Sequence, residues 1–168
     1  MNQIIAALII AVCLLQSHVG LAQGVTGSQT AQDTVDVQHV LDAFHEAVVK
    51  HDGDRLSALF LPEGSLWVKV LSDAAYARIM TKSPPPAKLQ VSSYRDFAKF
   101  VSNSTAKLDP QHTHVQIHSD GTIASVYFDF VFMIDGKAEN RGSETWQLVK
   151  AADGWRIVAI TYSADPKA

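Results

Sequence analysis

Apolar residues recur at helical spacing early in the chain, and this pattern predicts an amphipathic helix over residues 34–50. The apolar stripe of this helix consists of Val37, Val40, Leu41, Phe44, Ala47 and Val48. Gly53 is suited to the left-handed conformation that often ends a helix. Residues 23–33 are small and polar, and we expect them to form a flexible leader. The folded domain is therefore placed at residues 34–163, with a C-terminal tail at 164–168.

Shorter patterns in the middle of the chain predict two more helices and two strands. Asp54 can cap a short helix, and Ser93 precedes a helix over residues 94–105 that has an aspartate at the capping-box position. Residues 64–71 alternate between apolar and polar side chains, which is typical of a strand. Residues 77–82 are interpreted as a further short strand.

Three Asp-Gly pairs divide the last third of the chain. They are Asp120-Gly121, Asp135-Gly136 and Asp153-Gly154. An Asp-Gly pair between apolar runs is a strong signal for a two-residue hairpin turn. The sequence therefore predicts an antiparallel meander whose strands cover residues 112–118, 122–134, 137–152 and 155–163.

Two-residue turns at these pairs set a register, and the register divides the side chains between two faces of the sheet. One face is apolar and should meet the helices; it holds Val115, Ile117, Val126, Phe128, Phe130, Phe132, Thr145, Gln147, Val149, Val158, Ile160 and Tyr162. The other face mixes aromatic and charged groups; it holds His112, His114, Gln116, Tyr127, Asp129, Glu144, Trp146, Leu148 and Thr161. A β-bulge in a long strand would exchange the two faces beyond the bulge.

The mixed face is typical of a protein interface. A large apolar side chain such as Trp146 would otherwise form an exposed patch on the sheet. We therefore expect a homodimer through this face, with Tyr127, Trp146 and Leu148 near the centre of the contact.

The first residues are typical of a secretory signal peptide over residues 1–22. An unbroken apolar run over residues 4–15 precedes the small residues that fit cleavage after Ala22. The run is too short to span a bilayer, which takes about 20 apolar residues. We expect an exported protein, periplasmic or secreted, without a stable membrane span after cleavage. The only cysteine, Cys13, would leave with the peptide.

Composition narrows the classes of function. The net charge is −3 and the basic residues are scattered, whereas a nucleic-acid-binding domain carries a stripe of Lys and Arg. The sequence has no Gly-rich phosphate loop, no nucleophile elbow, and no HExxH or CxxC motif. We therefore expect no nucleic-acid partner and no cofactor.

Two segments of the chain resemble domains of the NTF2-like (SnoaL-like) superfamily. The first is HDGDRLSALF followed by PEGSLWV, which is similar to the turn and short helix before the first strand of these domains. The second is GSETWQLVKAADGWRIVAITYS, which is similar to their terminal hairpin. The resemblance covers about residues 35–163, and the pattern looks most like the SnoaL-like or lumazine-binding-like group.

This resemblance implies an α+β fold, the NTF2-like cone, in which a curved antiparallel sheet wraps round three N-terminal helices. It also implies a pocket between the concave face of the sheet and the first helix. By position, the residues near that pocket would be Phe44, Trp67, Phe128, Gln147 and Tyr162. The convex face of such domains often forms a dimer, in agreement with the mixed face described above.

Several histidines are candidates for chemistry. His112 and His114, with Asp129 across from them, could form a metal site. A pair of histidines two residues apart is common by chance, and the alternative is a hydrogen-bonded polar cluster on the convex face; we predict no metal. His45 borders the apolar stripe of the first helix, where it could act as a general base or simply flank the stripe.

Two functions remain open. The first is an exported domain that binds a small apolar or aromatic molecule, with Gln147 and Tyr162 as the polar groups of a mainly apolar pocket. The second is a lyase or isomerase of dehydratase or ketosteroid-isomerase type acting on a small hydrophobic substrate, for which the resemblance implies carboxyl groups inside the cone. The predicted inner face carries no Asp or Glu, which favours binding. If His112, Asp129 and Glu144 lined the cone instead, the register would be wrong by one residue and the enzyme would be favoured.

Overall fold

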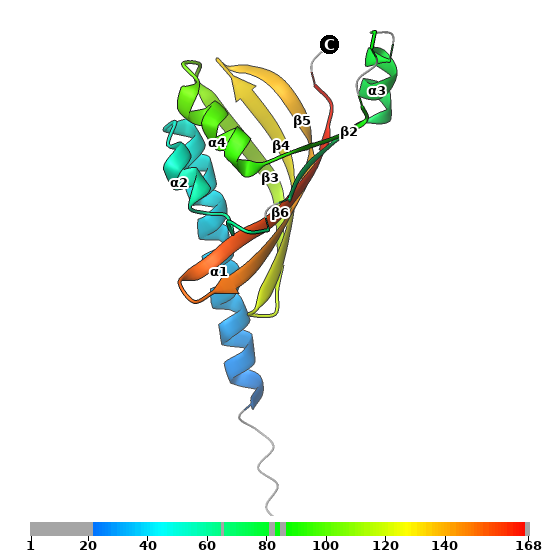
Figure 1. Cartoon of the computed structure of the whole chain (residues 1–168). Helices are drawn as coiled ribbons and strands as arrows, with labels where there is room; N and C mark the ends of the chain where they lie inside the picture. Colours follow the sequence, from blue (N-terminus) through cyan, green and yellow to red (C-terminus); the bar gives the residue numbers. More distant parts are fainter. Residues whose placement is uncertain (1–21, 65, 81–82, 85–86, 167–168) are drawn as a thin grey trace, which may run out of the picture.

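A computed structural model describes residues 22–64, 66–80, 83–84 and 87–166. One curved sheet of six strands forms the body of the molecule and does not close into a barrel. Helices cover one face of this sheet, here called the inner face, so that sheet and helices enclose a cone (Figure 1). The predicted α+β cone is confirmed. The predicted signal peptide, except for Ala22, lies outside the described residues.

The sheet combines the predicted meander with one parallel pair. Its strands are β1 (Leu66–Leu71), β2 (Leu89–Ser92), β3 (Leu108–Ser119), β4 (Ile123–Ile134), β5 (Lys137–Ala151) and β6 (Gly154–Ala164). They lie in the spatial order β2-β1-β6-β5-β4-β3, and the last four in sequence are antiparallel as predicted. β1 runs parallel to β6, so the sheet is mixed rather than wholly antiparallel. No hairpin constrains this pair, because most of the domain separates the two strands in sequence.

Three helices lie along the inner face of the sheet. They are α1 (Ala22–Val49), α2 (Gly53–Ser57) and α4 (Tyr94–Asn103). The predicted apolar stripe of α1 is buried in full, from Val37 to Val48. Ser93 and Asp96 form a capping box at the start of α4, as the sequence predicts. None of the described helices is long and apolar enough to cross a membrane.

Helix α1 begins earlier than the sequence predicts. Residues 23–33 are helical and do not form a separate flexible leader. The end of this segment is held by Asp33, which is fully buried and accepts a hydrogen bond from Lys150 Nζ at 2.6 Å. The same ammonium group lies 5.7 Å from the centre of the Trp155 ring. This ion pair attaches the N-terminal half of α1 to β5, a tertiary contact that local composition does not reveal.

A fourth helix stands apart from the others. Part of the segment predicted as a strand over residues 77–82 belongs to α3 (Asp73–Ile79). Ser72 caps this helix and accepts a hydrogen bond from Ala75 N at 3.1 Å. α3 projects from the far ends of β1 and β2, near the C-terminal end of the chain (Figure 1). The local cap therefore outweighs the short apolar pattern that suggested a strand.

β-bulges decide which residues of the meander face the helices. One extra residue in a strand reverses the direction of every side chain beyond it. Glu139 is the extra residue of β5, because Met133 pairs with Ala138 whereas Phe132 pairs with Asn140. The residues that flank the Asp135-Gly136 turn pair in the predicted register, but the part of β5 that follows the bulge is shifted by one residue.

Two other bulges lie in the meander. β3 contains one extra residue between Thr113 and Gln116, where His114 adopts a left-handed conformation with φ of 54°. β6 contains Val158 as an extra residue opposite the step from Gln147 to Leu148. The side chains of β3 and β6 therefore change face part of the way along each strand.

The register predicted for β5 is wrong by one residue as a result. Glu144, Trp146 and Leu148 lie on the inner face, where Trp146 and Leu148 are buried in the core. Gln147 is exposed on the opposite face, here called the outer face. Trp146 and Leu148 cannot form the centre of a dimer contact, since neither reaches the surface. Tyr127 does lie on the outer face as predicted and is 43% exposed.

Candidate functional site

A cavity of about 230 Å³ lies inside the cone, between the sheet and helices α1 and α4. Every strand of the sheet contributes to its wall, which is mostly aromatic. The lining residues are Phe44, Trp67, Ser92, Phe97, Pro110, His112, Phe130, Phe132, Asn140, Glu144 and Tyr162. Among the described residues, no Lys or Arg lines this cone cavity. Its chemistry is therefore set by aromatic rings and a few uncharged or acidic groups.

The structure brings together three of the five residues predicted near the pocket, namely Phe44, Trp67 and Tyr162. Phe128 is fully buried behind the wall, with its ring centre 4.5 Å from that of His112. Gln147 does not line the cone cavity, because the bulge at Glu139 turns it to the outer face. Of the two polar residues predicted for the pocket, only Tyr162 therefore lines the cone cavity, and it does so together with Glu144.

Glu144 is the carboxyl group inside the cone. It faces the cone cavity from β5, and its Oε1 accepts a hydrogen bond from Trp146 Nε1 at 2.5 Å. Glu144 is partly buried in the cavity wall, and burial raises its pKa to about 7, against the opposing effect of the Trp146 hydrogen bond. Near neutral pH, Glu144 can therefore both donate and accept a proton.

Tyr162 stands beside Glu144, because the two residues are direct partners across β5 and β6. Burial raises the pKa of Tyr162, the negative charge of Glu144 acts in the same direction, and a hydrogen bond with Trp67 acts in the opposite one. The Tyr162 hydroxyl therefore keeps its proton at neutral pH and can donate a hydrogen bond. One place on the cavity wall thus offers a phenol and a carboxyl group side by side.

His112 enters the cone from β3, just before the bulge that turns His114 outward. Burial and, to a smaller extent, the charge of His45 lower the pKa of His112 to about 4, although two nearby aspartates act in the opposite direction. The imidazole is therefore neutral at pH 7. It can accept a hydrogen bond from a molecule in the cone cavity.

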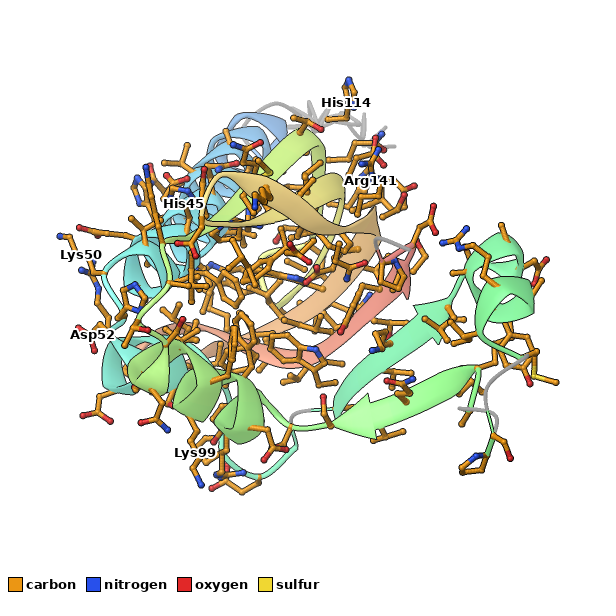
Figure 2. All side chains as sticks on the ribbon, turned by 90° about the horizontal axis from the view of Figure 1, so that it is seen from above. His45, Lys50, Asp52, Lys99, His114 and Arg141 are labelled. Carbon is orange, nitrogen blue, oxygen red and sulfur yellow. The ribbon has the colours of Figure 1, made fainter. Side chains whose placement is uncertain are left out.

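A groove of about 490 Å³ lies on the other side of His112, between α1 and β3. His45 lines this groove and does not line the cone cavity (Figure 2). Its Nε2 is 3.2 Å from Oδ1 of Asp109, and Gln111 donates a hydrogen bond to Oδ2 of the same carboxylate at 3.0 Å. His45 is thus a surface neighbour of His112, and the geometry does not favour it as a base inside the cone.

The predicted pair of His112 and His114 does not converge on one point. His114 projects from the outer face (Figure 2), where its Nδ1 is 3.0 Å from Oδ2 of Asp129. Ser143 Oγ donates a hydrogen bond to Oδ1 of the same aspartate at 2.9 Å. In the part of the chain that the structure describes, no three His, Cys, Asp or Glu residues are placed to hold a metal ion. The alternative of a polar cluster on the convex face therefore holds for His114 and Asp129, but not for His112, which lies inside the cone.

Sequence reasoning missed Glu144 and His112 as cavity residues. The side-chain types of β5 carried a usable signal, since Trp146 and Leu148 on one face are far more often buried than Thr145 and Gln147 on the other. Glu144 shares the face of Trp146 and Leu148. For His112 no comparable signal exists, because the bulge beside it has no glycine to mark it.

Comparisons with known proteins agree with this architecture. The SnoaL-like domain family matches residues 37–165, and a search of curated sequences finds no match. An NTF2-like protein with a cystatin-like fold from Novosphingobium aromaticivorans superposes with a TM-score of 0.62 at 11% identity, covering 88% of this chain and 91% of that one. A candidate dehydratase of the NTF2-like family from Streptomyces avermitilis gives 0.59 at 18% identity, covering 82% and 98%. A candidate scytalone dehydratase from Novosphingobium aromaticivorans gives 0.61 at 10% identity, covering 83% and 88%.

Proposed function

The chain belongs to the SnoaL-like domain family, and from the contents of its cone we propose that it is an acid–base enzyme, a lyase or isomerase acting on a small molecule whose reacting part is uncharged. One observation carries this proposal: Glu144, with a pKa of about 7, lies in the wall of an aromatic cavity. A carboxyl group buried among apolar side chains costs stability. A protein that only bound apolar molecules would gain nothing from this cost.

The neighbours of Glu144 support a reaction at a carbon beside a carbonyl group. The Glu144 carboxylate removes a proton from that carbon, while the Tyr162 hydroxyl donates a hydrogen bond to the carbonyl oxygen, where negative charge develops. In an isomerase the proton then returns to a different carbon. In a dehydratase it joins a departing hydroxyl group, which leaves as water; the resemblance to two candidate dehydratases supports this second form.

The size and lining of the cone cavity support a substrate with an aromatic or alicyclic body. A dry apolar cavity of about 150 Å³ holds benzene, so a cavity of about 230 Å³ has room for one or two rings. The wall presents Phe44, Trp67 and Phe97 to those rings. Since the lining includes no Lys or Arg among the described residues, the part of the substrate inside the cone carries no negative charge.

Proton exchange into 2-tetralone, a neutral two-ring ketone, tests the proposal. The protein is incubated with the ketone in D₂O, and loss of the proton signals beside the carbonyl group is followed by NMR. We expect exchange faster than in buffer, a loss of about 100-fold in Glu144→Gln, and a smaller loss in Tyr162→Phe. Glu63→Gln, which changes an exposed glutamate, is the matched control and should exchange at the wild-type rate.

Two results would count against an enzyme. If 2-tetralone binds, seen as a rise in melting temperature, but no exchange is catalysed, the cone is a binding site only. If Glu144→Gln exchanges as fast as the wild type, the reaction does not depend on the buried carboxyl group.

The proposal includes export, on the basis of the apolar run at residues 4–15 and the small residues before the cleavage point. Cleavage after Ala22 gives a mature chain that starts at Gln23. N-terminal sequencing of the purified periplasmic or secreted protein checks this, and a cytoplasmic product that keeps Met1 would contradict it.

Self-association through the outer face is also proposed, with a different centre from the one predicted. The pairing of the strands aligns one row of residues across five of them, and none of the row is charged. The row is Tyr127, Thr145, Thr161, Val68 and Val91. Val91 is 70% exposed and Tyr127 is 43% exposed, so a partner that covered this row would remove apolar area from water.

A further inference from the structure

A second hollow adjoins the cone cavity. It has a volume of about 570 Å³ and lies between α3, the first residues of β5, and the segment that follows β6. Asn140 is a lining residue of both this hollow and the cone cavity. The charged lining residues are Arg78, Lys137, Glu139, Arg141 and Asp165. We call this space the basic hollow.

The charges of the basic hollow favour an anion. Three cations line it against two carboxylates, whereas the whole chain has a net charge of −3. Arg78 and Asp165 already form an ion pair at 2.5 Å. Within the described residues, the side chains of Lys137 and Arg141 make no hydrogen bond or ion pair, although Glu139 is nearby. Two cations are therefore available to a ligand beside an otherwise cation-free cavity.

Asn140 is placed to connect the two spaces. Its Oδ1 accepts a hydrogen bond from the backbone N–H of Arg141 at 3.0 Å. This bond fixes the orientation of the side-chain amide and leaves its NH₂ group to donate. The position depends on the bulge, because the extra residue Glu139 turns Asn140 toward the inner face.

We propose that the basic hollow binds the anionic end of an elongated substrate whose ring system lies in the cone cavity. The anionic group is a carboxylate or phosphate, held by Arg141 and Lys137, and the connecting chain passes Asn140. The inference rests on the proposed function, since it extends the substrate of the same site. The substrate is then uncharged where it meets Glu144 and negatively charged at its far end.

Three naphthalene probes test this inference by calorimetry. They are 2-naphthol, 4-(2-naphthyloxy)butanoate and the corresponding butanamide, so that the acid and the amide differ only in the charge of the tail. We expect the acid to bind at least about tenfold more tightly than the amide, and this advantage to shrink as salt is added. In the double variant Arg141→Gln, Lys137→Gln the advantage should fall below about threefold, while 2-naphthol binds as before.

Lys99→Gln is the matched control, because it removes an exposed cation from α4, on the other side of the molecule from Arg141 (Figure 2). It should leave the advantage of the acid unchanged, and Glu139→Gln should increase it. Equal binding of acid and amide to the wild type, or an advantage that survives the double variant, overturns the inference. If 2-naphthol fails to bind but the acid binds through Arg141, the ring site of the proposed function fails and the anion site stands. No binding of any probe overturns both.

Discussion

At the scale of single residues, Glu144 links the proposed chemistry to stability. Its carboxyl group has a pKa of about 7 in the folded chain, against an ordinary value of 4.5. Below pH 4.5 the group is protonated in both states. As pH rises through the interval up to 7, the unfolded chain releases the proton before the folded chain does, and the folded state loses about 3 kcal/mol.

Glu144→Gln should remove this loss. Near pH 4.5 the variant and the wild type should have similar free energies of unfolding, and at about pH 8 the variant should be more stable by about 3 kcal/mol. Urea denaturation at a series of pH values measures the difference. Glu63→Gln should show no such trend, and a constant difference at every pH would mean that the Glu144 carboxyl group is not buried in the folded protein.

At the scale of elements, Gly53 shows how closely two helices approach. A Cβ atom built on Gly53 of α2 would lie 2.5 Å from the carbonyl oxygen of Ala98 in α4. We expect Gly53→Ala to destabilise the protein by about 2 kcal/mol or more, because backbone cannot move aside as a side chain can. Gly64→Ala is the control, since its Cβ would meet only Leu61 Cδ2 at 4.0 Å. Thermal unfolding of both variants decides whether this contact is as tight as described.

The attachment of α1 to β5 gives a second prediction at this scale. Lys150→Met leaves the fully buried Asp33 without its cation, and we expect a loss of about 3 kcal/mol. Adding Asp33→Leu should recover much of it, because the buried charge is then gone. Lys50→Met breaks an exposed pair with Glu46 and should change stability by less than about 1 kcal/mol. Hydrogen exchange at residues 30–36 should be faster in Lys150→Met than in the wild type, and unchanged in Lys50→Met. Unchanged exchange in Lys150→Met would contradict the attachment of α1 to β5.

The sequence predicts elements better than it predicts faces. The stripe of α1 and the capping box of α4 are local patterns, and both are confirmed. β4 contains no extra residue, so its inner residues Val126, Phe128 and Phe130 are also as predicted. β3, β5 and β6 each contain a bulge. The alternation of apolar and polar residues does not by itself show where the extra residue lies. The candidate site could be only half predicted, because a bulge separates Glu144 and His112 from the hairpin turns that set their predicted registers.

At the scale of the whole molecule, the outer row predicts the oligomeric state. Tyr127→Glu combined with Val91→Lys introduces charges of opposite sign at two positions in that row, and either charge would be buried by self-association. We expect monomers of the double variant in sedimentation velocity experiments, with the thermal stability of the monomer preserved. Val49→Lys, at a 39% exposed position near the end of α1, should leave the dimer intact. A wild-type protein that sediments as a monomer would refute the proposal.

The bulge at Glu139 also bears on how such domains diverge. A point substitution alters one side chain of the cone, but loss of a single codon at this place would exchange the whole row beyond it, bringing Thr145 and Gln147 inward and sending Glu144 outward. An ionisable group can thus be gained or lost from the cavity wall in one heritable step, without any amino-acid substitution. Descent with the same fold is therefore compatible with abrupt changes of chemistry, and a gap in an alignment at this point carries more information than many substitutions.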